Sequence, residues 1–150
     1  MISKRLTTAG LVAVATALFT ANGTAMAPMA RPEGNPDIQK GRSAPFVGEW
    51  SIYLPTREVG LIDTNLAICA LPVRIGVANE THIFYLGPRD TELDAAIEMI
   101  ADGDGTSWVP IAGGPSYFAI FVDADNFYLY EAEAADQQDW SQPYLYRRCP

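Results

Sequence analysis

Positive charge and histidine are both scarce in this chain. Its 150 residues include 10 lysines and arginines against 18 aspartates and glutamates, which gives a formal net charge of −8. An acidic surface repels nucleic acid and anionic lipid, so neither is an expected partner. His82 is the single histidine, and no nucleophile-elbow motif supplies a serine for it to activate. We therefore expect that the protein is not an enzyme and that it carries no cofactor.

Cysteine is almost as rare, because Cys69 and Cys149 are the only two. They do not form a CxxC pair, and a single histidine cannot complete a zinc-ligand cluster with them. The acidic stretches at 102–105 and 123–126 lack the twelve-residue pattern of a calcium loop, so we expect no metal site. In an exported chain an even cysteine count indicates a disulfide. Closing a loop of 80 residues (149 minus 69) would stabilise the fold by roughly 4 kcal/mol.

The chain also lacks an unbroken apolar run of the about 20 residues that a membrane span needs. Its N-terminus has the order of a secretory signal, with Lys4 and Arg5, an apolar run over residues 6–20, and small residues at Ala25 and Ala27. We predict a signal peptide over residues 1–27, cleaved after Ala25 or Ala27. The mature protein would be secreted or periplasmic, without a membrane span. Losing two basic residues leaves 8 against 18 acidic ones, so the charge falls from −8 to −10.

Residues 28–45 and 46–150 differ in composition. From Met29 to Pro45 the first stretch has scattered charges and five prolines and glycines, namely Pro32, Gly34, Pro36, Gly41 and Pro45. We predict that it is a flexible lead-in. From Phe46 onward apolar runs alternate with polar turns, and about 105 residues suffice for one modest core. We predict a single folded domain over residues 46–150.

The apolar runs after Phe46 have the length and the flanking turns of β-strands. Strands are expected at 46–54, 81–87 and 144–149, and on either side of a turn at 123–126. Pro72 divides the run at 66–77 into two short strands or a broken edge strand. Because strand follows strand without a βαβ rhythm, the fold class is mainly β.

Residues 90–110 are compatible with two structures. Leu93, Ile97 and Ile100 recur at helical spacing, and Gly103 can end a helix. Periodicity therefore favours one short helix near residues 91–101. The alternative is a hairpin that turns at 102–105.

Aromatic residues gather in the last third of the domain. Six of them are candidates for ligand binding: Tyr117, Phe121, Tyr128, Tyr130, Tyr144 and Tyr146. A tyrosine ring packs while its hydroxyl seeks a partner, so such a cluster on the inner wall of a barrel would suit a flat or apolar ligand. The alternative is that these rings fill a small core.

Three short stretches, in order along the domain, resemble the lipocalin family. Gly48-Glu49-Trp50 is similar to the Gly-x-Trp that opens the first lipocalin strand, and residues 122–127 resemble the aspartate-containing turn between the last two long strands. Arg148 matches an arginine that lies two residues before a proline in the closing strand of bacterial lipocalins. The resemblance implies a small antiparallel up-and-down β-barrel. It also implies that Arg148 packs over Trp50 at the closed end, as a cation–π pair.

These observations lead to three hypotheses about function. The leading one is an exported protein that holds a small hydrophobic or aromatic molecule in the barrel. The alternative is a small secreted proteinase inhibitor or another protein-binding barrel. Small bacterial inhibitors use a similar short barrel and act through an extended N-terminal segment, comparable in position with residues 29–45. The third is a structural envelope protein without a ligand.

Overall fold

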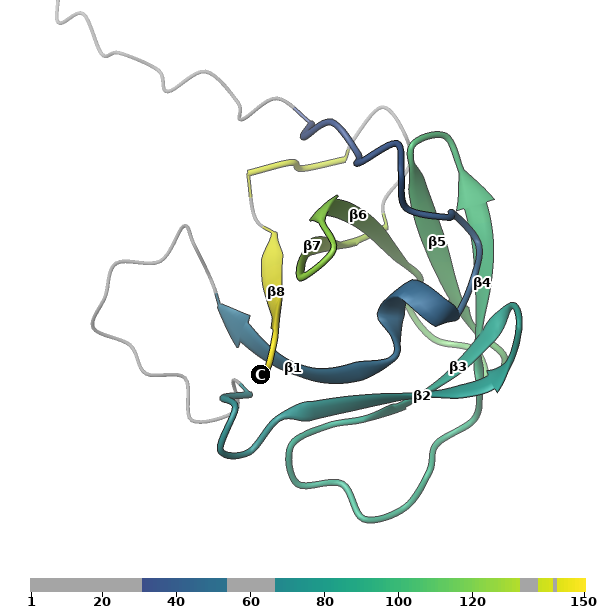
Figure 1. Ribbon diagram of the computed structural model, residues 1–150. Coiled ribbons are helices and arrows are strands. Elements are labelled where there is room, and N and C mark those ends of the chain that lie inside the picture. The colour runs from purple at the N-terminus through teal and green to yellow at the C-terminus, as the bar shows by residue number, and fades with distance from the viewer. Residues whose placement is uncertain (1–30, 54–66, 133–137, 142) are drawn as a thin grey trace, which may run out of the picture.

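The described residues, 31–53, 67–132, 138–141 and 143–150 of a computed structural model, form a closed antiparallel barrel (Figure 1). Its strands are β1 (Gly48–Tyr53), β2 (Val73–Asn79), β3 (His82–Leu86), β4 (Ile97–Asp102), β5 (Gly105–Pro110), β6 (Tyr117–Asp123), β7 (Asn126–Glu131) and β8 (Tyr144–Arg148). Each strand pairs with the next along the chain, and β8 returns to β1. A 3₁₀ turn, η1 (Ala44–Phe46), precedes β1. The prediction of a mainly β, up-and-down barrel is confirmed.

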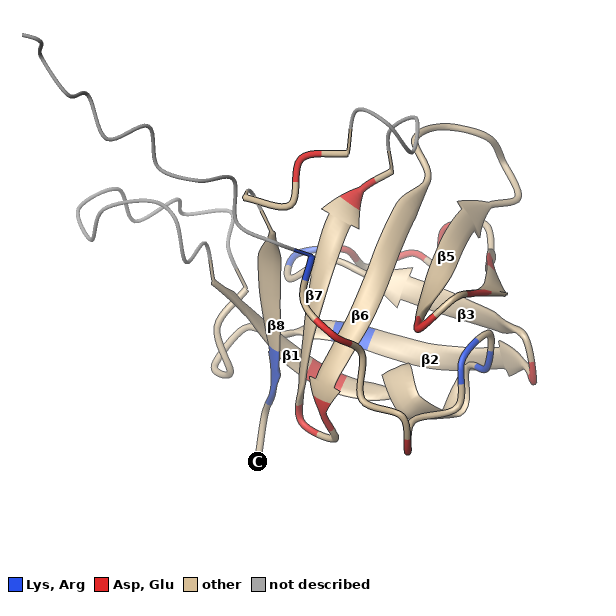
Figure 2. Cartoon of the chain, turned by 90° about the horizontal axis from the view of Figure 1, so that it is seen from above, with Lys and Arg blue, Asp and Glu red and all other residues tan. Residues whose placement is uncertain are grey.

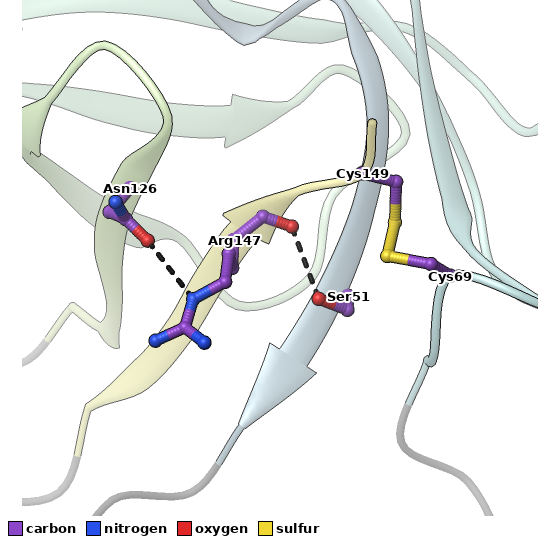
Figure 3. Close-up of a disulfide and its surroundings, with 5 residues drawn as sticks. All are labelled: Ser51, Cys69, Asn126, Arg147 and Cys149. Carbon is purple, nitrogen blue, oxygen red and sulfur yellow. Dashed lines mark hydrogen bonds between the residues drawn. A yellow bond between two sulfur atoms is a disulfide. The ribbon is translucent and has the colours of Figure 1, made fainter.

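The barrel closes where β8 meets β1, with Trp50 opposite Arg148. Just beyond β8, the predicted disulfide joins Cys149 to Cys69, whose Cα atoms are 5.4 Å apart (Figure 3). The hydroxyl of Ser51 on β1 adds a bond to the carbonyl oxygen of Arg147 on β8, at 3.2 Å (Figure 3). The last strand is therefore held by a strand ladder, by a side chain and by a covalent bond.

The helix favoured near residues 91–101 is wrong, because this stretch supplies β4 and pairs with β5 as a hairpin. Met99 lies opposite Trp108, and both side chains are almost fully buried. Leu93, which the helical spacing would direct into the core, is 60% exposed. The buried Met99–Trp108 pair in the barrel outweighs the local helical pattern.

The apolar run at 66–77 is divided near Pro72 where the structure describes it, which both expectations for this run have in common. A single bridge joins Ile68 to Leu71, and β2 begins directly after the proline at Val73. Since proline has no N–H to donate, the ladder of β2 starts after it.

Alternation along the strands separates two apolar clusters. The inner cluster fills the barrel and includes Trp50, Trp108, Phe121 and Phe127. The outer cluster lies on the opposite face of β6 and β7 and is made by Phe118, Ile120 and Tyr130, with Tyr128 and Trp140 packed against it. Both faces of β6 are therefore covered, as the continuous apolar run indicates.

The lead-in expected over residues 28–45 makes specific contacts where it is described. Residues 31–46, here called the strap, pass beside β4 and β5 and end in η1 (Figure 1). The amide of Asn35 donates to the carbonyl oxygen of Phe121 at 2.7 Å, and the amide of Gly41 donates to a threonine hydroxyl of β5 at 3.0 Å. These bonds give the strap a defined path, which its proline and glycine content did not predict.

The signal peptide predicted over residues 1–27, with its cleavage site, lies outside the described residues. Within the described ranges, no helix is long and apolar enough to cross a membrane.

Candidate functional site

One end of the barrel is closed by a side chain from the strap. Phe46 is fully buried, and its ring centroid lies 4.7 Å from that of Phe121 and 5.2 Å from that of Trp108. Its carbonyl oxygen accepts a 2.7 Å hydrogen bond from the indole nitrogen of Trp50. Ile38, also from the strap, packs against the same cluster. The strap is therefore part of the barrel core.

Arg148 ties the strap to the last strand. Its guanidinium carbon lies 4.2 Å from the ring centroid of Trp50, which is the contact that the resemblance implied. Two of its nitrogens donate to the carbonyl oxygens of Val47, at 2.7 Å, and Pro45, at 2.9 Å. An ion pair with Asp125 at 3.1 Å adds the β6–β7 turn. One side chain thus joins three segments at the closed end.

Tyrosines line the part of the inner cluster that is farther from Phe46, toward the end of the barrel where β8 begins. The hydroxyls of Tyr85 and Tyr146 are 2.9 Å apart, and Tyr117 and Tyr144 pack nearby, partly buried. Burial raises the pKa of Tyr85 to about 12 and that of Tyr146 well above its ordinary value. Burial, followed by the charge of Glu131, also raises the pKa of Tyr117. The phenols of Tyr85, Tyr117 and Tyr146 therefore keep their protons to a higher pH than an exposed tyrosine would.

A buried donor without an acceptor lies in the same cluster. Trp108 is 1% exposed, and its indole N–H has no hydrogen-bond partner among the described residues. Its ring centroid is 6.3 Å from that of Tyr85. Buried indole donors usually have a partner, so this one marks a point where an acceptor atom could bind.

The six aromatic candidates from the sequence fall into two groups. Tyr117, Phe121, Tyr144 and Tyr146 belong to the inner cluster, whereas Tyr128 and Tyr130 belong to the outer one. The structure adds Phe46, Tyr85 and Trp108 to the inner set. Strand alternation predicts part of this division. Because Phe127 and Leu129 point inward, Tyr128 and Tyr130, which alternate with them on β7, must point outward.

Two hollows lined by described residues lie at the closed end. One, between the strap and the barrel beside Thr106, holds about 10 Å³, the space of one water molecule. The other is an open groove of about 450 Å³ between Ile38, Pro45, Ala124 and Arg148. Neither is an enclosed pocket for a small organic ligand.

No group of three or more potential metal ligands occurs in the described ranges of the chain. The acidic turn at 123–126 has a local role, because Asp123 accepts bonds from the Asp125 amide and the Asn126 side chain at 2.8 Å each. Such a bond pattern is that of an Asx turn. His82 contacts Asn79 and Thr81 next to it in a strand connection.

Comparisons with protein-family models, with curated proteins and with solved structures found no match for this chain. The fold class therefore follows from the strand pairing alone. An up-and-down barrel of eight strands is the architecture found in lipocalins and other calycins.

Proposed function

We propose that the mature protein is an exported protein-binding barrel, namely a small proteinase inhibitor. It would contact its partner through its N-terminal segment. The three lipocalin-like motifs support a calycin-type relationship for the barrel. The observation that carries the proposal is the burial of Phe46: the strap that leads into the barrel fills its closed half. A carrier would need that space for a ligand.

The fixed path of the strap favours the same function. Each backbone residue that must be ordered on binding costs about 1–2 kcal/mol of conformational entropy. Hydrogen bonds from Asn35 and Gly41 to the barrel order the strap before any partner arrives. A pre-ordered segment therefore binds a cleft more tightly than a free one.

The charge of the molecule indicates what kind of partner surface would suit it. Aspartates and glutamates lie in turns and loops at both ends of the barrel, and basic residues are few (Figure 2). Complementary charge mainly speeds association and selects partners. We expect a partner with a basic rim around its binding cleft, and association that slows as salt is added.

The test is an inhibition assay with the mature protein, whose N-terminus is first established by sequencing the exported chain. A panel of purified secreted proteases, one each of the serine, cysteine and metal-dependent classes, is assayed with a fluorogenic peptide. We expect at least one protease to be inhibited with 1:1 stoichiometry. If the mature protein inhibits none of them, the inhibitor proposal fails.

A truncated chain that begins at Arg31 is the sharper variant. It keeps the strap and Phe46, so its melting temperature should match that of the mature protein, whereas its inhibition should be weaker by at least about tenfold. Val77→Ala, at an exposed side chain on β2 across the barrel from β6, is the matched control and should inhibit normally. Equal inhibition by all three proteins would exclude a role for the chain end.

A second candidate function is binding of a small hydrophobic or aromatic molecule at the tyrosine-lined end. The unpartnered indole N–H of Trp108, with the neutral phenols of Tyr85 and Tyr146, favours a ligand that carries an acceptor oxygen. Native mass spectrometry of protein purified from its own host would detect a retained molecule. No retained mass, together with no quenching of tryptophan emission by fatty acids or phenols, would count against it.

A further inference from the structure

The start of the strap is held in an aromatic and acidic box on the outside of the barrel. The guanidinium carbon of Arg31 lies 5.0 Å from the ring centroid of Phe118 and 5.2 Å from that of Trp140. The same guanidinium forms an ion pair with Asp104 in the β4–β5 turn. The other carboxylate oxygen of Asp104 accepts a 3.0 Å bond from the amide of Gly34. We call Phe118, Trp140 and Asp104 the Arg31 box.

The walls of the box are also held by contacts that do not involve Arg31. Trp140 packs edge-on against Tyr130 at 4.9 Å and against Phe118 at 5.9 Å. Tyr130 is 1% exposed, and burial raises its pKa. Gly105 leaves room for the ring, because a Cβ there would lie 2.4 Å from an edge atom of Phe118. These contacts fix the rings independently of the guanidinium.

The box is not part of the inner core of the barrel. It lies on the outer face, whereas Phe46 already closes the barrel from within. What the box adds is a second attachment of the strap along β6, at Phe118, three residues from the carbonyl of Phe121 that binds Asn35. Two attachments along one strand set a direction as well as a position. Arg31 is therefore held at a defined point beside Trp140.

We propose that Arg31 is a positioning residue: the Arg31 box grips its guanidinium and so holds the start of the N-terminal segment that contacts the protein partner at one place on β6. This inference rests on the proposed inhibitor function and names the residue that positions the N-terminal segment for binding. Arginine suits the box because a planar guanidinium can stack on two rings while it bonds a carboxylate. A lysine ammonium keeps the charge but not that geometry.

The first test needs no partner. Hydrogen exchange is followed in the free mature protein at the amides of Gly34 and Asn35, which bond to Asp104 and β6. We expect Arg31→Ala to speed exchange at both by at least about tenfold, and Asp104→Asn to do so at Gly34. Arg42→Ala is the matched control, since Arg42 lies in the strap and, among the residues that the structure describes, pairs only with the exposed Glu80 at 2.8 Å. Unchanged exchange in Arg31→Ala would overturn the proposal.

The second test separates positioning from a structural role. With a protease that the mature protein inhibits, we expect Arg31→Ala to lower the association rate constant about tenfold while the melting temperature stays within a few degrees. Arg31→Lys should recover part of that loss. Faster exchange without any change in inhibition kinetics would overturn the positioning role. If the unmutated protein inhibits no protease, the proposed function itself fails, and the exchange data still show whether the box holds the strap.

Discussion

The guanidinium of Arg148 stacks over the indole of Trp50 at 4.2 Å, and the two residues face each other across the seam between β8 and β1. The same guanidinium bonds the backbone carbonyls that lead out of the strap. The seam and the strap are thus fixed by one cation. Loosening it should weaken the closed end while leaving the rest of the barrel paired.

Replacing Arg148 tests this directly. Arg148→Ala removes the cation–π contact and leaves the Val47 and Pro45 carbonyls without their donor, so we expect a loss of about 2–3 kcal/mol in the free energy of unfolding. Arg147→Ala on the same strand is the control and should cost less than about 1 kcal/mol, because that side chain is exposed. Urea unfolding followed by fluorescence gives both values. Equal losses would contradict a special role for Arg148.

Phe46 should be the strap residue on which stability depends most. Phe46→Ala empties a fully buried ring position, and such changes cost about 3–5 kcal/mol. Ile111→Ala, at a side chain 61% exposed, should change stability by less than about 0.5 kcal/mol. Thermal unfolding of both variants decides the matter. A small effect at Phe46 would mean that the strap is not part of the core.

Because Tyr85 and Tyr146 are buried, the free energy of unfolding should fall at alkaline pH. The pKa of Tyr85 is raised from 10.0 to about 12, so between these values the folded state keeps a proton that the unfolded state has lost. Stability is therefore complete below pH 10 and falls as the pH rises toward 12, by up to about 1.4 kcal/mol per pH unit for one group. In Tyr85→Phe the fall over that range should be shallower. An unchanged slope would show that Tyr85 is not protected from ionisation.

The disulfide should contribute strongly, because it closes a loop of 80 residues. Replacing both cysteines with alanine should lower the free energy of unfolding by roughly 4 kcal/mol. Reduction of the unmutated protein with dithiothreitol should lower its free energy of unfolding, measured with urea, by the same amount. If reductant also shifts the midpoint of the double variant, the effect does not come from the disulfide.

Much of the fold could be predicted because local patterns and tertiary packing agree. Alternation in β6, the turn at 123–126 and the cysteine count each determine one feature, and the structure has all three. The prediction of a helix near residues 91–101 is wrong because two of the three residues at helical spacing, Leu93 and Ile100, are 60% and 45% exposed, whereas the strand buries Met99 instead. In a short apolar run, periodicity alone does not distinguish a helix from a strand.

The strap and the inner site were harder to foresee. Proline and glycine indicate turns but not what the turns pack against, so neither the Phe46 plug nor the Arg31 box could be derived from composition. The sequence places Tyr128 and Tyr130 in one group with Tyr144 and Tyr146, because all four lie in the last third of the domain. Pairing of Phe121 with Phe127 across the turn, which puts both in the inner cluster, would have separated them.

The most direct measurement of where a partner binds is a hydrogen-exchange map of the mature protein, free and bound to a protease from the panel. We expect slower exchange in the bound state over the strap, residues 31–46, at the neighbouring β4–β5 turn and beside Trp140, with no change around Tyr85 on β3. Protection confined to the tyrosine-lined end would contradict binding through the N-terminal segment.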